Sequence, residues 1–225
     1  MQDVDAIYNL VDFAERYEGV QLQSTAATVV NFAGILYNVI GSTHDPKIDG
    51  ADWKQLLRNN GIGAAGTPTN QCYATAPPAD PVSSHNAFSV GGHVTVNADG
   101  SVTGGTCYLM PLCSWHNNSA RNGMPFNHVL TQMLRLSGYM QAEPAATFLA
   151  RMPSAAPYRL VSVEGSQLIN RELHEPQVLQ LKAEQPQAED QAPWPEHYLL
   201  FRQIHEGGET RYVIEDKRLP NQASS

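Results

Sequence analysis

The chain has 225 residues, of which 42% are apolar and 16% charged, a composition that can bury a core and is not that of a disordered chain. Its formal charge of −8 disfavours broad coating of nucleic acid, although a local basic patch or a bound cation can override the net field. No apolar run reaches the roughly eighteen residues of a membrane span. Acidic residues stand near the start, where a signal peptide carries basic ones. We therefore expect a cytoplasmic protein with no membrane partner; export by a signal-independent route would leave no mark in the sequence.

The first part of the chain is predicted to be helical. From Val4 to Ala14, apolar residues recur at steps of three and four, as they do on one face of a helix. A second helix is predicted over 26–40, an apolar segment ended by Gly41, although its Val and Ile content also permits a buried strand. A short helix is expected at 51–59, within a turn-rich stretch.

The pattern changes from Phe88 onward. Turn residues between two alternating runs predict a pair of antiparallel strands, at 88–96 and 106–111. A helix is then predicted over 117–138, because its apolar residues cluster on one side at helical spacing. That helix would begin within two or three residues of His116.

Strands are predicted again from residue 157 to the C-terminal end. Two alternating runs flank the tetrapeptide Glu206–Glu209, whose central glycines suit a tight turn. The preceding polar, proline-containing segment at 184–195 is expected to be a loop. The C-terminal part is therefore predicted to be an antiparallel hairpin or a small sheet.

Three cysteines are present, at positions 72, 107 and 113. An odd number in a chain of this length disfavours a disulfide framework, so buried thiols or metal ligands are expected. Cys107 lies within a predicted strand and is expected in the core.

The predicted hairpin and the helix after it can bring His93 and Asn117 to one point. His93 lies near the end of the first strand, and Asn117 lies at the predicted start of the helix. An imidazole with a near-neutral pKa suits a general base, and an amide oxygen suits a hard cation such as Mg²⁺. Together the two groups would activate water beside a metal-bound phosphate.

The run that carries Val90-Gly-Gly-His93-Val and then Tyr108-Leu-Met-Pro-Leu-Cys-Ser-Trp-His-Asn117 resembles the HNH, or His-Me finger, nucleases, which have a ββα-metal core. The resemblance covers residues 70–120. It implies that His93 is the general base and that Asn117 ligates a divalent metal such as Mg²⁺. It also implies that Cys113 and His116 form a metal-binding knuckle.

The resemblance further implies a structural zinc site. Its third ligand would be Cys72, and His85 is a candidate for the fourth, because Thr75 stands where many family members carry a second cysteine. Arg121 follows Asn117 by one turn of the predicted helix and is a candidate contact to a substrate phosphate, or else an exposed helix arginine.

On this interpretation the chain is an α+β protein with one domain over residues 1–225. Its parts would be a helical N-terminal part at 1–66, a ββα-metal core at 67–140 and a C-terminal β part at 155–220. The predicted function is metal-dependent hydrolysis of phosphodiester bonds, with a nucleic acid as substrate and an inhibitor or effector protein as a partner.

Two other functions remain open. One is a catalytically inactive HNH-like scaffold that binds a protein partner. The other is a cysteine hydrolase, in which Cys72 or Cys113 would be the nucleophile and His93 or His128 the base.

Overall fold

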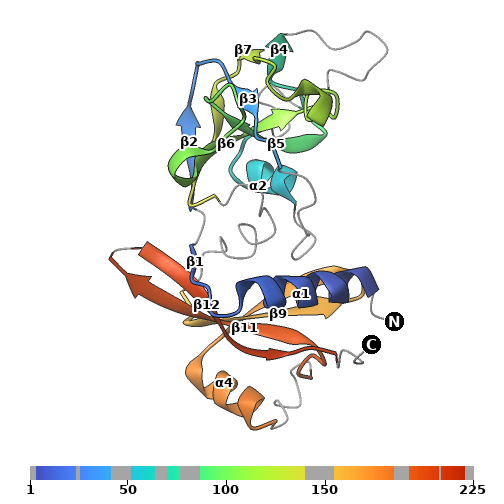
Figure 1. Cartoon of the computed structure of the whole chain (residues 1–225), viewed down its shortest axis with the longest axis vertical. Coiled ribbons are helices and arrows are strands. Elements are labelled where there is room, and N and C mark those ends of the chain that lie inside the picture. The colour runs from blue at the N-terminus through green and yellow to red at the C-terminus, as the bar shows by residue number, and fades with distance from the viewer. Residues whose placement is uncertain are drawn as a thin grey trace. The chain divides into compact units, whose positions relative to one another are not determined.

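A computed structural model describes residues 4–23, 26–41, 52–63, 70–76, 87–139, 155–184, 193–207 and 209–220. The chain divides into two compact units, and Figure 1 shows the elements of both. The two ends of the chain form one of them, which we call the terminal unit, and the middle of the chain forms the central unit. Helices and antiparallel sheets occur together, which confirms the predicted α+β class. The single domain with three consecutive parts stays a prediction.

The terminal unit is built on a five-stranded antiparallel sheet, in the order β1-β12-β11-β9-β10. Its strands are β1 (Leu22–Gln23), β9 (Tyr158–Glu164), β10 (Gln167–Leu173), β11 (Tyr198–Glu206) and β12 (Glu209–Arg218). The predicted hairpin is confirmed, because Glu206 pairs with Glu209 across a turn in which Gly207 has a φ of 60°. The C-terminal sheet also takes in a strand from the N-terminal part of the chain, since Leu22 of β1 pairs with Tyr212 of β12.

Two helices cover opposite faces of this sheet, α1 (Val4–Tyr17) and α4 (Glu175–Lys182), as Figure 1 shows. Phe201 of β11 meets Phe13 of α1, with ring centroids 6.0 Å apart. The preceding residue, Leu200, points the other way because successive strand side chains alternate between faces. It belongs to the core cluster beneath α4, whose members are Leu160, Leu173, Val178, Leu181, Tyr198 and Leu200.

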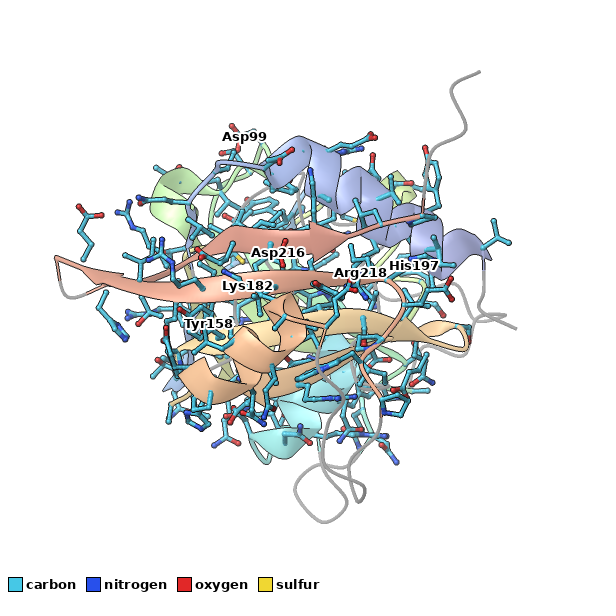
Figure 2. The ribbon with its side chains drawn as sticks, turned by 90° about the horizontal axis from the view of Figure 1, so that it is seen from below. Asp99, Tyr158, Lys182, His197, Asp216 and Arg218 are labelled. Carbon is cyan, nitrogen blue, oxygen red and sulfur yellow. The ribbon has the colours of Figure 1, made fainter. Side chains whose placement is uncertain are left out.

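Lys182 of α4 and Arg218 of β12, both labelled in Figure 2, are each paired with an acidic side chain. Glu215 binds Lys182 at 3.2 Å and Arg202 at 2.9 Å, and Arg218 binds Glu184 at 2.7 Å. The pKa of Glu215 is lowered, mainly by the hydrogen bond that it accepts from Arg202. These cations are therefore engaged by carboxylates and do not form an uncompensated phosphate-binding patch.

The central unit contains a second five-stranded antiparallel sheet, in the order β2-β8-β6-β5-β3. Its strands are β2 (Ala26–Asn31), β3 (Tyr37–Asn38), β5 (Val90–Thr95), β6 (Thr106–Leu112) and β8 (Gln132–Ser137). The predicted pairing of 88–96 with 106–111 is confirmed by β5 and β6, in which His93 lies opposite Leu109. The other described strands of the unit, β4 (Ala74–Ala76) and β7 (Asn127–His128), form a two-stranded sheet.

The short helix predicted at 51–59 is confirmed as α2 (Trp53–Asn59). Its N-terminus is capped by Asp52, whose carboxylate accepts a hydrogen bond from the backbone N–H of Gln55 at 2.8 Å. The helix packs closely on β5, since a Cβ atom at Gly91 would lie 2.7 Å from the backbone carbonyl carbon of Trp53. Glycine at this position therefore sets the distance between α2 and the sheet.

The helix predicted over 26–40 is wrong, because this segment forms β2 and β3. The β-branched residues Thr28, Val29 and Val30 favour a strand, and β2 gains a full antiparallel pairing with β8. β2 lies at the edge of the sheet, and Val29 is 41% exposed. The alternative of a strand is therefore correct, although the strand is not a buried one.

The helix predicted over 117–138 is also wrong. Between residues 117 and 138 the chain forms a 3₁₀ turn, η2 (Ser119–Arg121), and then β7 and β8. Another 3₁₀ turn, η1 (Thr103–Gly105), precedes β6. Gly123 has a φ of 76°, which interrupts any helical path. β8 instead pairs with strands on both sides, and Leu134 and Leu136 are fully buried. The ββα-metal finger is therefore not confirmed: its two strands are present, and a helix at 117–138 is not.

Candidate metal centre

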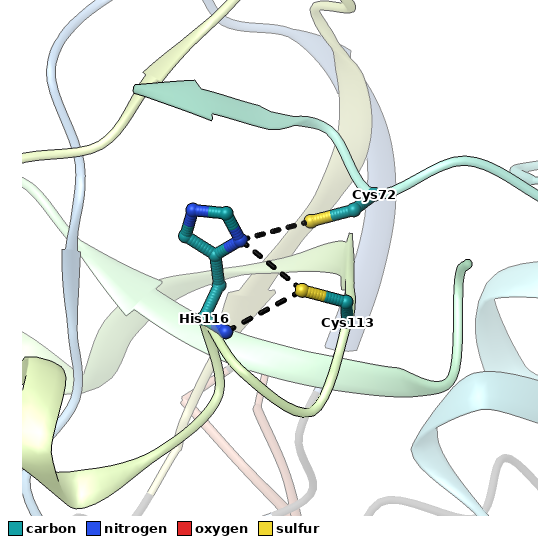
Figure 3. A group of neighbouring side chains, drawn as sticks. All are labelled: Cys72, Cys113 and His116. Carbon is teal, nitrogen blue, oxygen red and sulfur yellow. Dashed lines mark hydrogen bonds between the residues drawn. The ribbon is translucent and has the colours of Figure 1, made fainter. Parts of the chain in front are cut away.

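Three side chains that are separated in sequence meet in the central unit, from Cys72, Cys113 and His116 (Figure 3). The Nδ1 atom of His116 lies 3.4 Å from the sulfur of Cys72 and 3.2 Å from the sulfur of Cys113. All three candidate ligand atoms lie within 4.8 Å of one another. We call these three residues the metal group, because each offers an atom that could hold a metal ion.

Two features of the backbone place the metal group. Cys113 directly follows β6, and the chain then turns back on itself, with a 3.0 Å hydrogen bond from the backbone N–H of Asn117 to the carbonyl of Cys113. This turn, residues 113–117, we call the knuckle turn. Cys72 is brought alongside because the N–H of Tyr73 donates to the carbonyl of Pro111 at 2.9 Å, just before the end of β6.

The metal group is buried. His116 is fully buried, Cys113 is 1% exposed and Cys72 is 9% exposed. Two main causes raise the pKa of the Cys72 thiol well above its usual range: the side-chain hydrogen bond with Cys113, which is the larger, and burial. The Cys72 thiol of the metal-free protein is therefore protonated at neutral pH, and a metal ion would displace that proton on binding.

Aromatic rings enclose the imidazole of His116. The Trp115 ring meets it edge to face at 4.8 Å, and the Phe126 ring does so at 5.3 Å. The side-chain amide of Asn38 donates a 2.8 Å hydrogen bond to the His116 carbonyl. His116, whose Nδ1 contacts both cysteine sulfurs, is thus held through its ring and through its backbone carbonyl.

The structure does not bring His93 and Asn117 to one point. The His93 ring stacks on Tyr139 at 4.7 Å and meets Trp53 of α2 edge to face at 4.5 Å. Asn117 approaches the other face of β5, since a Cβ atom at Gly92 would lie 2.9 Å from its Oδ1. Residues 92 and 93 point to opposite faces of the strand, so the amide oxygen and the imidazole are separated by the sheet.

Arg121 lies in η2 and not on a helix face. Its guanidinium carbon lies 3.9 Å above the ring of Trp115, a cation–π distance, and its Nη1 donates to the carbonyl of Ala120 at 3.4 Å. His128, the other base considered for a cysteine hydrolase, lies in β7, where its two ring nitrogens lie 2.9 Å from the carbonyls of Leu130 and Gly34. Neither side chain is directed to the metal group by these contacts.

His85, the predicted candidate for a fourth ligand, lies outside the described residues. Thr75 donates from its hydroxyl to the carbonyl of Asn127 at 3.0 Å and stands on β4, so it supports the two-stranded sheet. Within the described ranges, the metal group therefore supplies three ligand atoms.

The sequence does not identify Asn38 as a partner of this turn, because its segment is predicted to be a helix. One signal was available: an asparagine inside the apolar run from Ile35 to Ile40 is a polar group that has to find a partner if it is buried. Its partner is 78 residues away, which sequence spacing does not reveal.

The chain matches no protein-family model, and comparisons with curated proteins and with solved structures found no similar protein. No helix of the described chain is both long enough and apolar enough to cross a bilayer.

Proposed function

We propose that the central unit is a zinc-stabilised scaffold, in which Cys72, Cys113 and His116 bind one structural Zn²⁺. The observation that carries the proposal is the convergence of two sulfurs and one imidazole nitrogen within 4.8 Å in a buried site. Thiolate and imidazole are the ligands that structural zinc sites use.

The distances support this choice. With Zn–S bonds of about 2.3 Å and Zn–N bonds of about 2.0 Å, tetrahedral geometry holds a sulfur and a nitrogen ligand about 3.5 Å apart. Nδ1 of His116 lies 3.4 and 3.2 Å from the two sulfurs. Both nitrogen–sulfur distances are therefore close to those of a tetrahedral zinc site. A hard ion such as Mg²⁺ prefers oxygen ligands, and this group offers none.

The proposed ion would link distant parts of the chain. Cys72 precedes β4, whereas His116 lies 44 residues later in the knuckle turn after β6. Closing a loop of this length removes conformational freedom from the unfolded chain, as a disulfide does. The expected role is therefore stability of the central unit.

The nuclease hypothesis receives less support from the geometry. A histidine base and an amide-held cation must share one water molecule, yet His93 and Asn117 approach β5 from opposite faces. Arg121, the predicted phosphate contact, is stacked on Trp115. Of the functions that the sequence left open, the non-catalytic scaffold is the one that these contacts favour.

A cysteine hydrolase is also less well supported. Its nucleophile has to be an accessible thiolate, which a lowered pKa provides. Cys72 and Cys113 are both buried, and the pKa of Cys72 is raised. A metal-binding role uses the same buried thiols without requiring substrate access.

The test is elemental analysis of the purified protein, with Cys113→Ala as the variant and Cys107→Ala as its matched control. Both cysteines are buried and belong to the same segment of chain, but Cys107 is not part of the metal group. We expect one zinc per chain in the parent protein and in the Cys107 variant, and loss of zinc in the Cys113 variant. Absence of zinc from the parent protein after refolding with excess Zn²⁺ would overturn the proposal.

A cleavage assay separates the scaffold from the nuclease. The scaffold proposal expects that the protein cuts neither plasmid DNA nor RNA with Mg²⁺ or Mn²⁺. Cleavage that is lost in a His93→Ala variant whose zinc content is unchanged would return the nuclease hypothesis to first place.

A further inference from the structure

We infer that Asn38 is a positioning residue for the metal group, which holds the knuckle turn in its metal-binding geometry and couples metal occupancy to the edge strand β3. This inference rests on the proposed zinc site. It assigns to one buried amide a role outside the ligand set.

The contacts of Asn38 point at the knuckle turn. Its Nδ2 donates to the carbonyl of His116 at 2.8 Å and lies 3.5 Å from the carbonyl of Asn118. The residue is 5% exposed, so the shorter bond is shielded from water. An amide nitrogen with two hydrogens can serve both carbonyls from one position.

The amide oxygen of Asn38 differs from its nitrogen in having no such partner among the described residues. Oδ1 of Asn38 is buried and accepts no hydrogen bond from the part of the chain that the structure describes. A buried acceptor without a donor destabilises the fold. What this side chain contributes is therefore its donor group, and that group is directed at the carbonyl of a metal ligand.

The geometry of a ligand depends on such outer contacts. The His116 ring presents Nδ1 to both sulfurs, so a rotation of its backbone would move the nitrogen away from both at once. The Asn38 bond fixes the His116 peptide, and the aromatic rings of Trp115 and Phe126 fix the imidazole. Loss of an outer contact typically weakens metal binding by about 10–100-fold.

Asn38 also ties the site to the sheet edge. It belongs to β3, a strand of two residues at the edge, where it pairs with Val94 of β5. The next residue, Val39, donates its N–H to the carbonyl of His93 at 3.0 Å. So short a strand has few hydrogen bonds of its own, and an ordered knuckle turn would stabilise it through Asn38.

The experiment measures zinc affinity by competition with a chromophoric chelator in the full-length parent protein and three variants. Asn38→Asp keeps the shape and removes the donor, and Asn38→Ala removes the donor without adding a charge. Asn97→Asp is the control, because the amide of Asn97 also donates to a turn, at 2.9 Å to the carbonyl of Ser101, without touching the metal group. We expect zinc affinity to fall about 10–100-fold in both Asn38 variants and by less than about threefold in the control.

A second readout separates positioning from general support of the fold. Hydrogen exchange of the Val39 amide should slow on zinc binding in the parent protein and the Asn97 variant, and much less in the Asn38→Ala variant. A merely structural residue would lower the stability of the metal-free and the zinc-bound protein equally, and would leave the zinc affinity of the folded variant unchanged.

The outcomes for the two proposals differ. If the parent protein binds no zinc, the metal site itself is wrong. If the parent protein binds zinc and both folded Asn38 variants bind it with parent affinity, the zinc site stands and the positioning role of Asn38 is refuted.

Discussion

The two units solve the problem of stability by different means. In the terminal unit, one sheet is covered on both faces, by α1 and by α4, and its apolar side chains alternate between the two layers. Where the structure describes it, the central unit has one short α-helix, α2, together with two sheets and a buried group of two thiols and an imidazole. The comparison indicates that helical cover supplies the core of the first unit, whereas the proposed metal ion would supplement the core of the second.

The largest expected effect follows from removal of the metal. Because the free energy of binding a structural metal ion contributes to folding, a strong chelator should destabilise the central unit and spare the terminal unit. Hydrogen exchange should show lost protection in β5 and β6 and retained protection in β9 and β11. Chelator that has been saturated with zinc is the control. Equal loss in both units, or no loss in either, would break the comparison.

Truncation of a core side chain in the terminal unit should lower the stability of that unit and leave zinc binding unchanged. Leu200 is fully buried beneath α4, so Leu200→Ala should lower the free energy of unfolding by about 2–5 kcal/mol while zinc affinity stays unchanged. Denaturant unfolding measures the first quantity and chelator competition the second. Leu179→Ala, at a position on α4 that is 61% exposed, should cost little. A weaker zinc site in the Leu200 variant would argue against independent sources of stability.

Two neighbouring glycines of β5 allow the two faces of the central sheet to be perturbed separately. A Cβ atom at Gly92 would lie 2.3 Å from a methyl carbon of Leu112 and close to Asn117, whereas one at Gly91 would meet the backbone of α2. Overpacking of this kind costs about 1–3 kcal/mol or more. Gly92→Ala should weaken zinc binding, and Gly91→Ala should destabilise α2 with a smaller effect on zinc. The reverse pattern, seen in chelator competition, would contradict the assignment of the two faces.

The smallest effect is expected at Arg121. Arg121 is half-buried, and its cation–π contact with Trp115 is worth about 0.5–2 kcal/mol, so Arg121→Gln should change stability by no more than that, and Arg121→Lys by less. Thermal unfolding of the zinc-bound protein measures both changes. A large loss of nucleic-acid binding in the glutamine variant would instead favour the phosphate contact that the sequence suggested.

Local patterns in the sequence predicted the elements that depend on near neighbours. The spacing of apolar residues in α1, the glycine turn between β11 and β12, and the strand pair β5–β6 are all confirmed. The segment 117–138 was mistaken for a helix because Met133, Leu134 and Leu136 fit a helical stripe as well as a strand buried on both faces. Pairing with β2 and β6 decides between the two, and those partners are distant in the sequence.

The candidate site was predictable to a similar extent. Cys113 and His116 are three residues apart, and the structure brings Cys72 to them as expected. The sequence also placed Asn117 near the His93 strand, but it did not reveal that the two side chains approach β5 from opposite faces. Asn38 reaches the knuckle turn only through the fold, because its strand is aligned by pairing with β5.

The central claim is that two thiolates and one imidazole bind a single metal ion, and cobalt substitution tests it most directly. Titration of the metal-free protein with Co²⁺ should saturate at one ion per chain, with the visible bands of a tetrahedral site and a thiolate-to-cobalt charge-transfer band. Cys113→Ala should abolish the charge-transfer band together with tetrahedral binding, Cys107→Ala should leave the band intact, and Zn²⁺ should abolish the spectrum by displacement. The weak spectrum of octahedral cobalt, or a charge-transfer band that survives in the Cys113 variant, would contradict the account.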